Sequence, residues 1–289
     1  MKKILIIAFA LLMLAGCSDA SHYSYLSDGD EVLFTGPNTT YTKNDLYKSL
    51  KLSATEAISS DILNKIALKL DDVDIDAINA DADELIETYK SLGYESYIIA
   101  SYGSIEAYKK SYVSTLLLNE LSKAYVKNDF DTLVAEKKPV KMQLASFQSQ
   151  EDAQKCIDDV ANGSTFDMAA VNNNADAAPQ STVYTDDDTS LAFEVKDYLN
   201  STDKTGLSTI IVNTKSSQDA NGNTTETNTY YVVNVESRNV EDFKDEAIEL
   251  FASQASSDDV KKYFLSAHDI EFFDQDLYKV MSSAYEELK

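Results

Sequence analysis

The hydrophobic pattern of this 289-residue chain changes its period twice, and this change limits the folds that the chain can adopt. From about residue 40 to residue 136, apolar residues recur at the three- and four-residue spacing of amphipathic helices. After Pro139, residues 140–147 alternate between apolar and polar, as expected for a strand with one buried face. Helical spacing returns after Arg238. The sequence therefore predicts an α+β fold in which a mixed block interrupts two helical segments.

The first helical segment contains clear helix start and stop signals. Thr42 and Asp45 have the spacing of a capping box, in which each residue bonds the backbone of the other. Gly93 follows a long apolar-periodic stretch and is expected to end that helix. After the helix that begins at Thr42, further helices are expected at residues 58–70, 75–92, 94–102 and 105–124.

The middle block, residues 138–237, is predicted to be a compact α+β domain. Ser149 and Asp152 again have capping-box spacing, and the polar stretch 216–228 is expected to be a long hairpin loop. The three acidic residues 186–188 are interpreted as the first turn of a helix. The expected elements are a strand at 140–147, helices at 149–163, 166–171 and 191–199, and strands at 207–212 and 229–235.

The two helical segments are expected to share one hydrophobic core. Helices in the last segment carry apolar faces marked by Phe251, Phe264 and Met281, among others. The simplest packing brings these helices against the first segment, with the middle block inserted between them in sequence. The expected divisions are a signal peptide at 1–16, a tether at 17–30, helical segments at 31–137 and 238–289, and the inserted domain at 138–237.

The N-terminus has the features of an export signal. Lys2 and Lys3 precede an apolar run at residues 4–14, which is too short for a membrane-spanning helix. The following Leu-Ala-Gly-Cys at residues 14–17 resembles the bacterial lipobox, in which cleavage precedes the cysteine and the thiol is acylated. Cys17 is therefore the predicted lipid anchor. The alternative is an ordinary cleaved signal peptide that happens to contain a cysteine.

The acidic composition restricts the partners of the chain. The formal net charge is -24, and loss of Lys2 and Lys3 with the signal changes it to -26. Nucleic-acid binding requires clustered basic residues and is not expected. Anionic lipid headgroups repel such a protein, so attachment to a membrane depends on the acyl chains. Once Cys17 is acylated, Cys156 has no intrachain disulfide partner.

No motif in the sequence indicates a cofactor or a metal site. The aspartates at 72, 74, 76 and 83 imitate the spacing of a calcium loop, but Ala77 stands at the turn position that needs glycine. These residues are interpreted as a solvent-exposed acidic segment that leads into a helix. The two histidines, His22 and His268, are far apart in sequence. Cys156 lies on an apolar helical face and is expected to be a buried, unreactive thiol.

Tyrosine is abundant in this chain, with 18 tyrosines and no tryptophan. Tyr89, Tyr108, Tyr112 and Tyr125 recur on helical faces. They are interpreted as packing residues, and the alternative is a groove that holds unfolded polypeptides through aromatic area and hydrogen bonds.

Several short motifs, in this order and spacing, resemble the PrsA-type foldase lipoproteins. They are the lipobox, Thr-Lys-Asn-Asp-Leu-Tyr at 42–47, Glu-Asp-Ala at 151–153, Gly-Ser-Thr-Phe at 163–166 and Tyr-Tyr-Val-Val-Asn-Val at 230–235. The resemblance covers nearly the whole chain. It implies a helical foldase domain, formed by the N- and C-terminal segments, with an inserted parvulin-type peptidyl-prolyl isomerase domain.

The inserted block departs from active parvulins at their site residues. By comparison with the family, Leu144 and Tyr231 stand at the positions of two histidines beside the proline pocket. Val195 stands where an aromatic residue floors that pocket, and residues 178–183 replace a glycine-rich stretch. These departures predict a domain with weak or no isomerase activity, kept as a binding or structural module. Activity is not excluded, because isomerisation breaks no covalent bond and shape alone can lower its barrier.

The function implied by the resemblance is that of a foldase or chaperone, lipid-anchored on the outer face of the cytoplasmic membrane. Its partners would be unfolded exported polypeptides, with no cofactor, and a homodimer is left open. An active peptidyl-prolyl isomerase is one alternative. A lipid-anchored solute-binding or adhesion protein is another, although solute-binding domains usually contain repeated strand–helix units and only one such block exists here.

Overall fold

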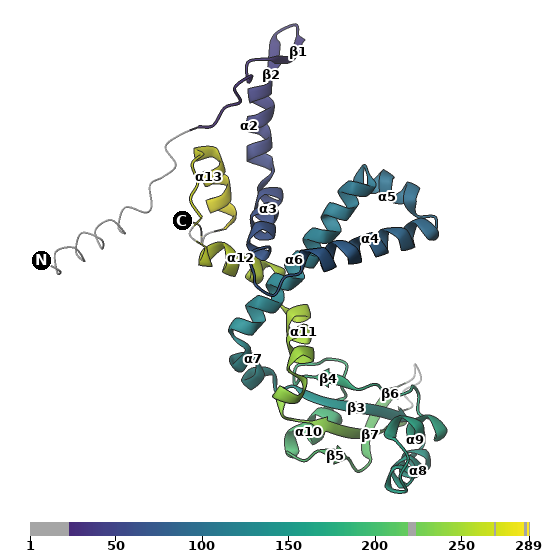
Figure 1. The fold of residues 1–289 in the computed structure, drawn as a ribbon. Helices are drawn as coiled ribbons and strands as arrows, with labels where there is room; N and C mark the ends of the chain where they lie inside the picture. The colour runs from purple at the N-terminus through teal and green to yellow at the C-terminus, as the bar shows by residue number, and fades with distance from the viewer. Residues whose placement is uncertain (1–22, 219–223, 269, 286–287, 289) are drawn as a thin grey trace, which may run out of the picture. The chain divides into compact units, whose positions relative to one another are not determined.

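The computed structural model describes residues 23–218, 224–268, 270–285 and 288 (Figure 1). The predicted signal peptide and Cys17 lie outside these residues. The chain divides into two compact units, one made of Met1–Tyr125 with Ala255–Lys289 and one made of Val126–Gln254. Helices dominate the first unit, and the second contains a sheet with helices, so the predicted α+β class is confirmed.

The first unit begins with a hairpin that leads directly into a helix. Thr42 ends the hairpin and caps the helix, and the predicted capping box with Asp45 is present. At the end of the third helix Gly93 has φ of 80°, a conformation that favours glycine, as the sequence predicts for a helix stop. The elements are β1 (Val32–Gly36), β2 (Thr39–Thr42), α2 (Lys43–Ser53), α3 (Thr55–Ala67), α4 (Ile75–Ser91), α5 (Glu95–Tyr102), most of α6 (Ile105–Asn128), α12 (Ser257–Ala267) and α13 (Gln275–Ala284).

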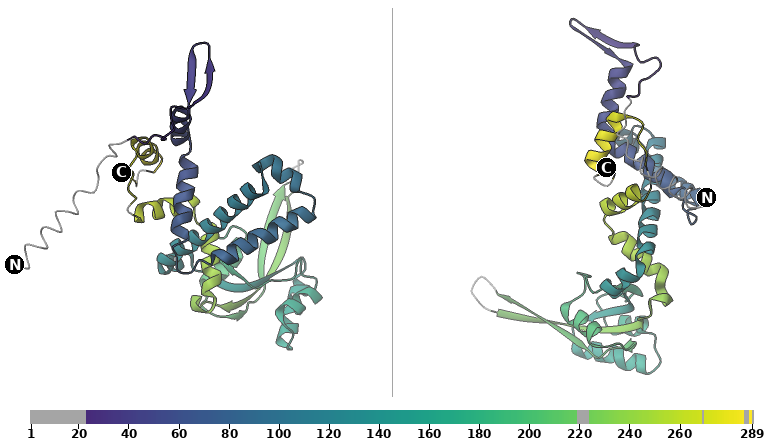
Figure 2. Two further views of the ribbon diagram at one scale, coloured as in Figure 1. Left: turned by 45° about the horizontal axis from the view of Figure 1, so that its top comes forward. Right: turned by 90° about the vertical axis from the view of Figure 1, so that its left-hand side faces the viewer.

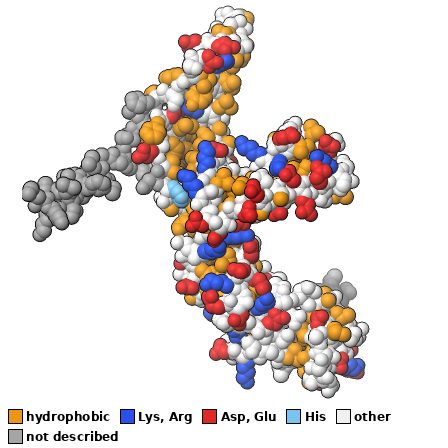
Figure 3. Space-filling view, viewed as in Figure 1, with side chains coloured by type: hydrophobic (Ala, Val, Ile, Leu, Met, Phe, Trp, Pro, Cys, Tyr) orange, Lys and Arg blue, Asp and Glu red, His pale blue; other side chains and the backbone are white. Residues whose placement is uncertain are grey.

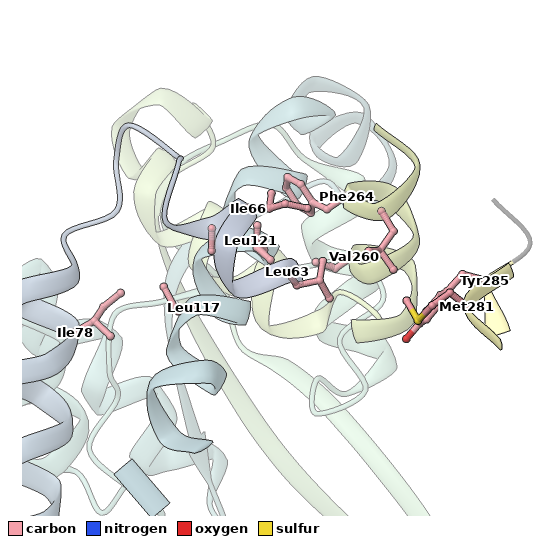
Figure 4. Packing of buried hydrophobic residues seen from close by; sticks show 11 residues of the cluster. Leu63, Ile66, Ile78, Leu117, Leu121, Val260, Phe264, Met281 and Tyr285 are labelled. Carbon is pink, nitrogen blue, oxygen red and sulfur yellow. The ribbon is translucent and has the colours of Figure 1, made fainter. Parts of the chain in front are cut away.

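Helices from both ends of the chain share the core of this unit, as predicted. Leu63 and Leu121 lie close to Phe264 and Val260 in Figure 4, although some 140 residues separate Leu121 from Val260 in sequence. Met281 and Tyr285 extend the same cluster at α13. The core therefore depends on the C-terminal helices, because they cover apolar faces that α3 and α6 would otherwise expose.

The second unit contains an antiparallel sheet built around one long strand. The sheet order is β4-β3-β7-β5, and β6 also pairs with β7. The strands are β3 (Val140–Phe147), β4 (Thr182–Tyr184), β5 (Gly206–Leu207), β6 (Ile211–Gln218) and β7 (Thr224–Ser237). Strands β5 and β6 pair with different halves of β7, as the pairings of Leu207 with Asn234 and of Ile211 with Tyr231 show.

Helices pack on both faces of this sheet. The alternation predicted for residues 140–147 is present, because Met142 faces one side and Ala145 and Phe147 face the other. The face with Phe147 contacts α8 (Gln150–Ala161) and α9 (Phe166–Asn172). The face with Met142 contacts α10 (Phe193–Ser201). The predicted capping role of Ser149 is also present, since its hydroxyl accepts hydrogen bonds from two N–H groups of α8.

The hairpin formed by β6 and β7 is longer than the sequence indicates. Residues 216–228 were expected to be a loop, but the ladder continues from Ile211 opposite Tyr231 to Gln218 opposite Thr224 (Figure 2). This expectation was wrong because these strand residues are polar and exposed on both faces. A strand without a buried face has no hydrophobic alternation to detect.

The acidic residues 186–188 do not begin a helix, so the prediction that they form the first turn of one was wrong. Helix α10 begins at Phe193, several residues later. Instead Asp187 accepts a hydrogen bond from the Thr185 hydroxyl at 2.6 Å and pairs with Lys137. Asp186 accepts one from the Asn200 side chain at 2.8 Å. These side-chain bonds hold the segment as a loop after β4, a strand that the sequence did not reveal.

The second unit extends beyond the predicted block 138–237 on both sides. It includes α7 (Phe130–Lys137), the 3₁₀ turn η1 (Val240–Phe243) and α11 (Lys244–Gln254). The rings of Phe130 and Phe251 lie 6.0 Å apart, and Lys244 lies over the Phe130 ring at 5.3 Å. These contacts join the two flanking helices to each other, and the ion pair between Lys141 of β3 and Glu246 of α11 links them to the sheet. The division at residues 137 and 238 remains a prediction about domain boundaries.

Candidate functional site

The three residues at the expected parvulin positions lie in one cluster between α10 and the sheet. Leu144 pairs with Val233 across β3 and β7, and Tyr231 lies two residues from Val233 on the same face. Leu144 and Tyr231 are partly buried and pack against the core that contains Val195. The structure therefore brings together the residues that the sequence comparison singled out, in the second unit.

Val195 fills this cluster rather than lining an opening. Its side chain is fully buried, so its position is occupied by core packing. Leu144 and Val195 cannot exchange protons, and neither histidine of the chain belongs to the second unit. The cluster offers apolar area and the Tyr231 phenol, but no imidazole.

Acidic side chains border the Tyr231 phenol. Burial raises the pKa of Tyr231, and the negative charges of Glu194 and Asp176 add to this effect, so the phenol stays neutral and can donate a hydrogen bond. Oε2 of Glu194 is buried without a hydrogen-bond partner in the described part of the chain. The Ser146 hydroxyl donates to Asp176 at 2.7 Å. This arrangement places hydrogen-bonding groups beside an apolar cluster.

A concavity of about 510 Å³ lies elsewhere in the second unit. Its apolar lining includes Tyr184 and Leu191, and its basic lining includes Lys196 and Arg238. Its size is within the range of pockets that hold small ligands or side chains. It is therefore a second place where a peptide segment could lie.

The first unit exposes apolar side chains around α5. Within eleven residues, five large apolar side chains are between 45% and 69% exposed. We call these residues the aromatic surface: Leu92, Tyr94, Tyr97, Ile99 and Tyr102. Exposed apolar surface that is concentrated in one place commonly marks an interaction site. In the sequence, the signal for this surface is the close spacing of Tyr94, Tyr97 and Tyr102, because one buried helix face cannot accommodate all three side chains.

Packed tyrosine rings support the aromatic surface from beneath. Tyr108 of α6 lies 4.9 Å from the Tyr102 ring and 6.0 Å from the Tyr89 ring, and Tyr89 also contacts Tyr94. Burial and a hydrogen bond with Tyr89 raise the pKa of Tyr108 to about 12. Tyr125 instead packs against Tyr263 at 5.2 Å, as a core residue does.

The segment that follows the lipid-attachment region is held against α2 and α13. Oδ2 of Asp274 accepts hydrogen bonds from the backbone N–H and the hydroxyl of Ser24, at 2.7 and 2.6 Å. Lys51 of α2 donates to the same oxygen at 2.9 Å and to Asp276 at 3.3 Å. Ser24 is therefore a fixed point seven residues after Cys17 in the sequence.

The remaining candidate residues have structural partners. Asp74 caps α4 by accepting bonds from the N–H groups of Asp76 and Ala77, and Asp83 pairs with Lys109. Within the described ranges, no group of three acidic, histidine or cysteine side chains could hold a metal ion. Burial raises the pKa of the Cys156 thiol to about 11, which makes it a poor nucleophile.

Comparison with known proteins decides how the chain is attached to the cell. Residues 1–18 match the prokaryotic membrane lipoprotein lipid attachment site. The chain is a lipid-anchored extracytoplasmic membrane protein, and Cys17 lies within the matched residues. Over the residues that the structure describes, no helix has the length and apolar character needed to span a bilayer. No curated protein matches the sequence.

The structure is similar to solved structures of PrsA foldases from several bacteria. The foldase protein PrsA from Streptococcus pneumoniae is 16% identical, with a TM-score of 0.47, and the match covers 89% of this chain and 99% of that one. The peptidylprolyl isomerase PrsA from Bacillus cereus is 15% identical, with a TM-score of 0.47 and coverage of 90% and 99%. PrsA from Bacillus subtilis is 18% identical, with a TM-score of 0.36 and coverage of 88% and 99%.

Proposed function

We propose that this lipoprotein is a foldase that binds unfolded exported polypeptides at the outer face of the cytoplasmic membrane. The observation that carries the proposal is the aromatic surface, which exposes Leu92, Tyr94 and Tyr97 in the first unit. Unfolded polypeptides expose apolar side chains that folded proteins bury, so an exposed apolar surface can bind them without sequence specificity. Tyrosine hydroxyls add hydrogen bonds to backbone groups that are not yet paired.

The charge of the chain supports the same activity. The molecule that carries the aromatic surface is strongly acidic, with a formal net charge of -24. Two such molecules repel each other, which keeps their bound polypeptides apart and soluble. Attachment through Cys17 would keep the aromatic surface close to the membrane across which its polypeptides are exported.

The parvulin-like block would provide a second contact, with weak or no isomerase activity. Leu144 and Val195 are apolar, and Tyr231 is a neutral phenol, so proton transfer is not available among these three groups. The buried position of Val195 leaves its site filled by the core. The concavity lined by Tyr184 and Arg238 is a better candidate for holding a peptide segment.

A holdase assay tests this proposal. The mature chain from Cys17 onward, with that thiol blocked, should suppress aggregation of a chemically unfolded secreted protein at stoichiometric concentration. Replacing Tyr97 and Tyr102 together by serine should reduce the suppression, because it removes exposed apolar area without emptying the core. The matched control is Phe193→Ser, which removes an exposed aromatic side chain from the second unit.

The two possible failures have different meanings. Absence of suppression by the unmodified chain would contradict the foldase proposal. Suppression that is equally reduced by Phe193→Ser and by the double tyrosine variant would contradict the assignment to the aromatic surface. Circular dichroism and thermal unfolding of each variant establish that its fold is retained.

A further inference from the structure

We propose that the hairpin of β1 and β2 docks on the same bilayer that holds the acyl chains of Cys17. The hairpin would lie in the interface between headgroups and acyl chains and act as a second, non-covalent contact. This goes beyond the lipid attachment site and beyond the foldase proposal, because it concerns how the anchored molecule is held at the membrane.

The hairpin is an uncharged element with exposed apolar side chains in an acidic protein. Residues 32–42 contain no Asp, Glu, Lys or Arg, although charged residues make up 26% of the chain. Val32, Leu33 and Phe34 are between 44% and 56% exposed, and every residue of β1 is exposed. The Phe34 ring stacks on the Tyr41 ring at 5.0 Å. In Figure 3, hydrophobic side chains are visible along α2, which leads from the hairpin.

This composition suits a bilayer interface. Aromatic and aliphatic side chains partition into the interface, and tyrosine can keep its hydroxyl among the headgroups. The backbone polar groups of the hairpin bond each other along its ladder, for example between Thr35 and Thr40. The outer edges of a two-stranded hairpin keep unpaired backbone groups, so the hairpin would lie at the depth of the headgroups, where water can bond these groups. The absence of charge also avoids repulsion by anionic lipids.

The length of the chain between Cys17 and Ser24 is the reason to choose a membrane as the partner. Seven residues span at most about 25 Å, even when fully extended. Ser24 is fixed by its bonds to Asp274 and Lys51. The Ser24 corner of the first unit therefore stays within about 25 Å of the lipid-bearing cysteine.

The hairpin lies within a similar distance of that corner. From Ser24 the chain runs along α2, because Leu26 bonds Asn44 at 3.0 Å and Asn44 bonds the Gly29 carbonyl at 2.9 Å. The path from Lys51 to Lys43 measures about 12 Å at the rise of a helix. The five residues of β1 add about 17 Å at the rise of a strand. A bilayer that holds the Cys17 acyl chains can therefore reach the hairpin.

Tethering also favours the membrane over other partners. A surface held this close to a bilayer experiences it at a high effective concentration, whereas a polypeptide or a second copy must first arrive by diffusion. Weak contacts from Leu33 and Phe34 are then enough to populate the docked state. The hairpin's own lipid contacts are uncharged, whereas the acidic charge of the whole chain should make docking weaker on anionic than on neutral lipid.

The absence of tryptophan from the chain allows a direct test. Phe34→Trp places a single fluorophore on the hairpin of the mature chain. Cys17 is coupled to a maleimide lipid in neutral phosphatidylcholine vesicles, and the buried Cys156, with its raised pKa of about 11, does not compete. The control is Tyr97→Trp, whose position is 69% exposed on the aromatic surface of the same unit.

The expected result is blue-shifted emission for Phe34→Trp on vesicles, with quenching by brominated lipid several-fold stronger than for Tyr97→Trp. Adding Leu33→Ser should weaken that quenching, and inserting a long Gly/Ser spacer after Ser18 should weaken it further. Equal, weak quenching of both probes would overturn the proposal. A blue shift that appears without vesicles would also overturn it. A shift that depends on protein concentration would indicate that the hairpin binds a second copy of the chain. A shift that follows addition of unfolded polypeptide would indicate that it binds that polypeptide. Circular dichroism of Phe34→Trp verifies its fold.

Discussion

Lys51 and Asp274 form a nearly buried ion pair that joins the two ends of the chain within the first unit. Their side chains are 6% and 5% exposed, and the Nζ–Oδ2 distance is 2.9 Å. Asp274 also caps α13 through the N–H of Leu277 at 2.9 Å and holds Ser24. One carboxylate therefore fixes the segment that follows the lipid anchor, the helix α2 and the start of the last helix.

Lys51→Met should destabilise the first unit strongly. The substitution keeps an aliphatic side chain of similar length but leaves the Asp274 carboxylate buried without its cation. Breaking one partner of a buried pair costs about 3–5 kcal/mol. Urea unfolding monitored by circular dichroism measures the loss as a lower midpoint.

Lys65→Met is the matched control for this experiment. Lys65 pairs with Asp61 at 2.8 Å, but their side chains are 71% and 58% exposed. Lys65→Met should change the free energy of unfolding by less than about 0.5 kcal/mol. Equal effects of the two substitutions would show that the Lys51 pair has no special structural role.

The contribution of this pair should disappear in acid. Burial opposes ionisation of Asp274, but hydrogen bonds from Ser24, Lys51 and the Leu277 N–H outweigh it and hold its pKa well below the ordinary value. A lowered folded-state pKa stabilises the fold fully above about pH 5, and this stabilisation is lost as the pH falls below the unfolded value near 4. The stability difference between the native chain and Lys51→Met should therefore be largest at neutral pH. A difference that stays constant down to about pH 2 would contradict this assignment.

Gly29→Ala should loosen the segment along α2. A Cβ at Gly29 would overlap the Asn44 side chain, whose amide oxygen accepts a hydrogen bond from the Leu26 N–H. Relief of the overlap requires movement of Asn44 and loss of that bond, with an expected cost of about 1–3 kcal/mol. Gly36→Ala is the control, because its Cβ would meet only a Thr39 methyl group at 3.3 Å. Limited proteolysis at Tyr23 and Tyr25 should be faster in Gly29→Ala than in the control.

Cys156 should react slowly in the folded chain. Its side chain is fully buried, and burial raises the pKa of its thiol to about 11, so few thiolates exist at neutral pH. With Cys17 blocked, labelling by a disulfide reagent should proceed at the rate of unfolding and become fast in denaturant. Rapid labelling without denaturant would mean that α8 opens readily.

The second unit should accelerate proline-limited refolding weakly or not at all. The barrier is about 18–20 kcal/mol, and Tyr231 is the one polar group among the three expected site residues. If the block is inactive, Tyr231→Ala leaves the slow refolding rate unchanged, and Leu144→Ala serves as the second comparison. Marked acceleration that either substitution abolishes would favour the alternative of an active isomerase.

Much of the local structure follows from the sequence. The Thr42–Asp45 capping box, the stop at Gly93 and the alternation in residues 140–147 appear as predicted, because each depends on neighbours within a few residues. The hairpin of β6 and β7 was predicted with strands that are too short, because the outer strand residues within 216–228 are polar and have no buried face. The aspartates 186–188 were misassigned because Lys137 and Asn200, far away in sequence, decide their role.

Composition, periodicity and short motifs are enough to predict the lipid attachment site, the α+β class and most helices. The folded chain alone reveals that Lys51 meets Asp274, that Val195 is buried in a core, and that Leu33 and Phe34 remain exposed. The physical reason is that burial and ion pairing depend on which distant segments meet. No pattern in the sequence predicts that residues 51 and 274, which lie 223 positions apart, form a pair.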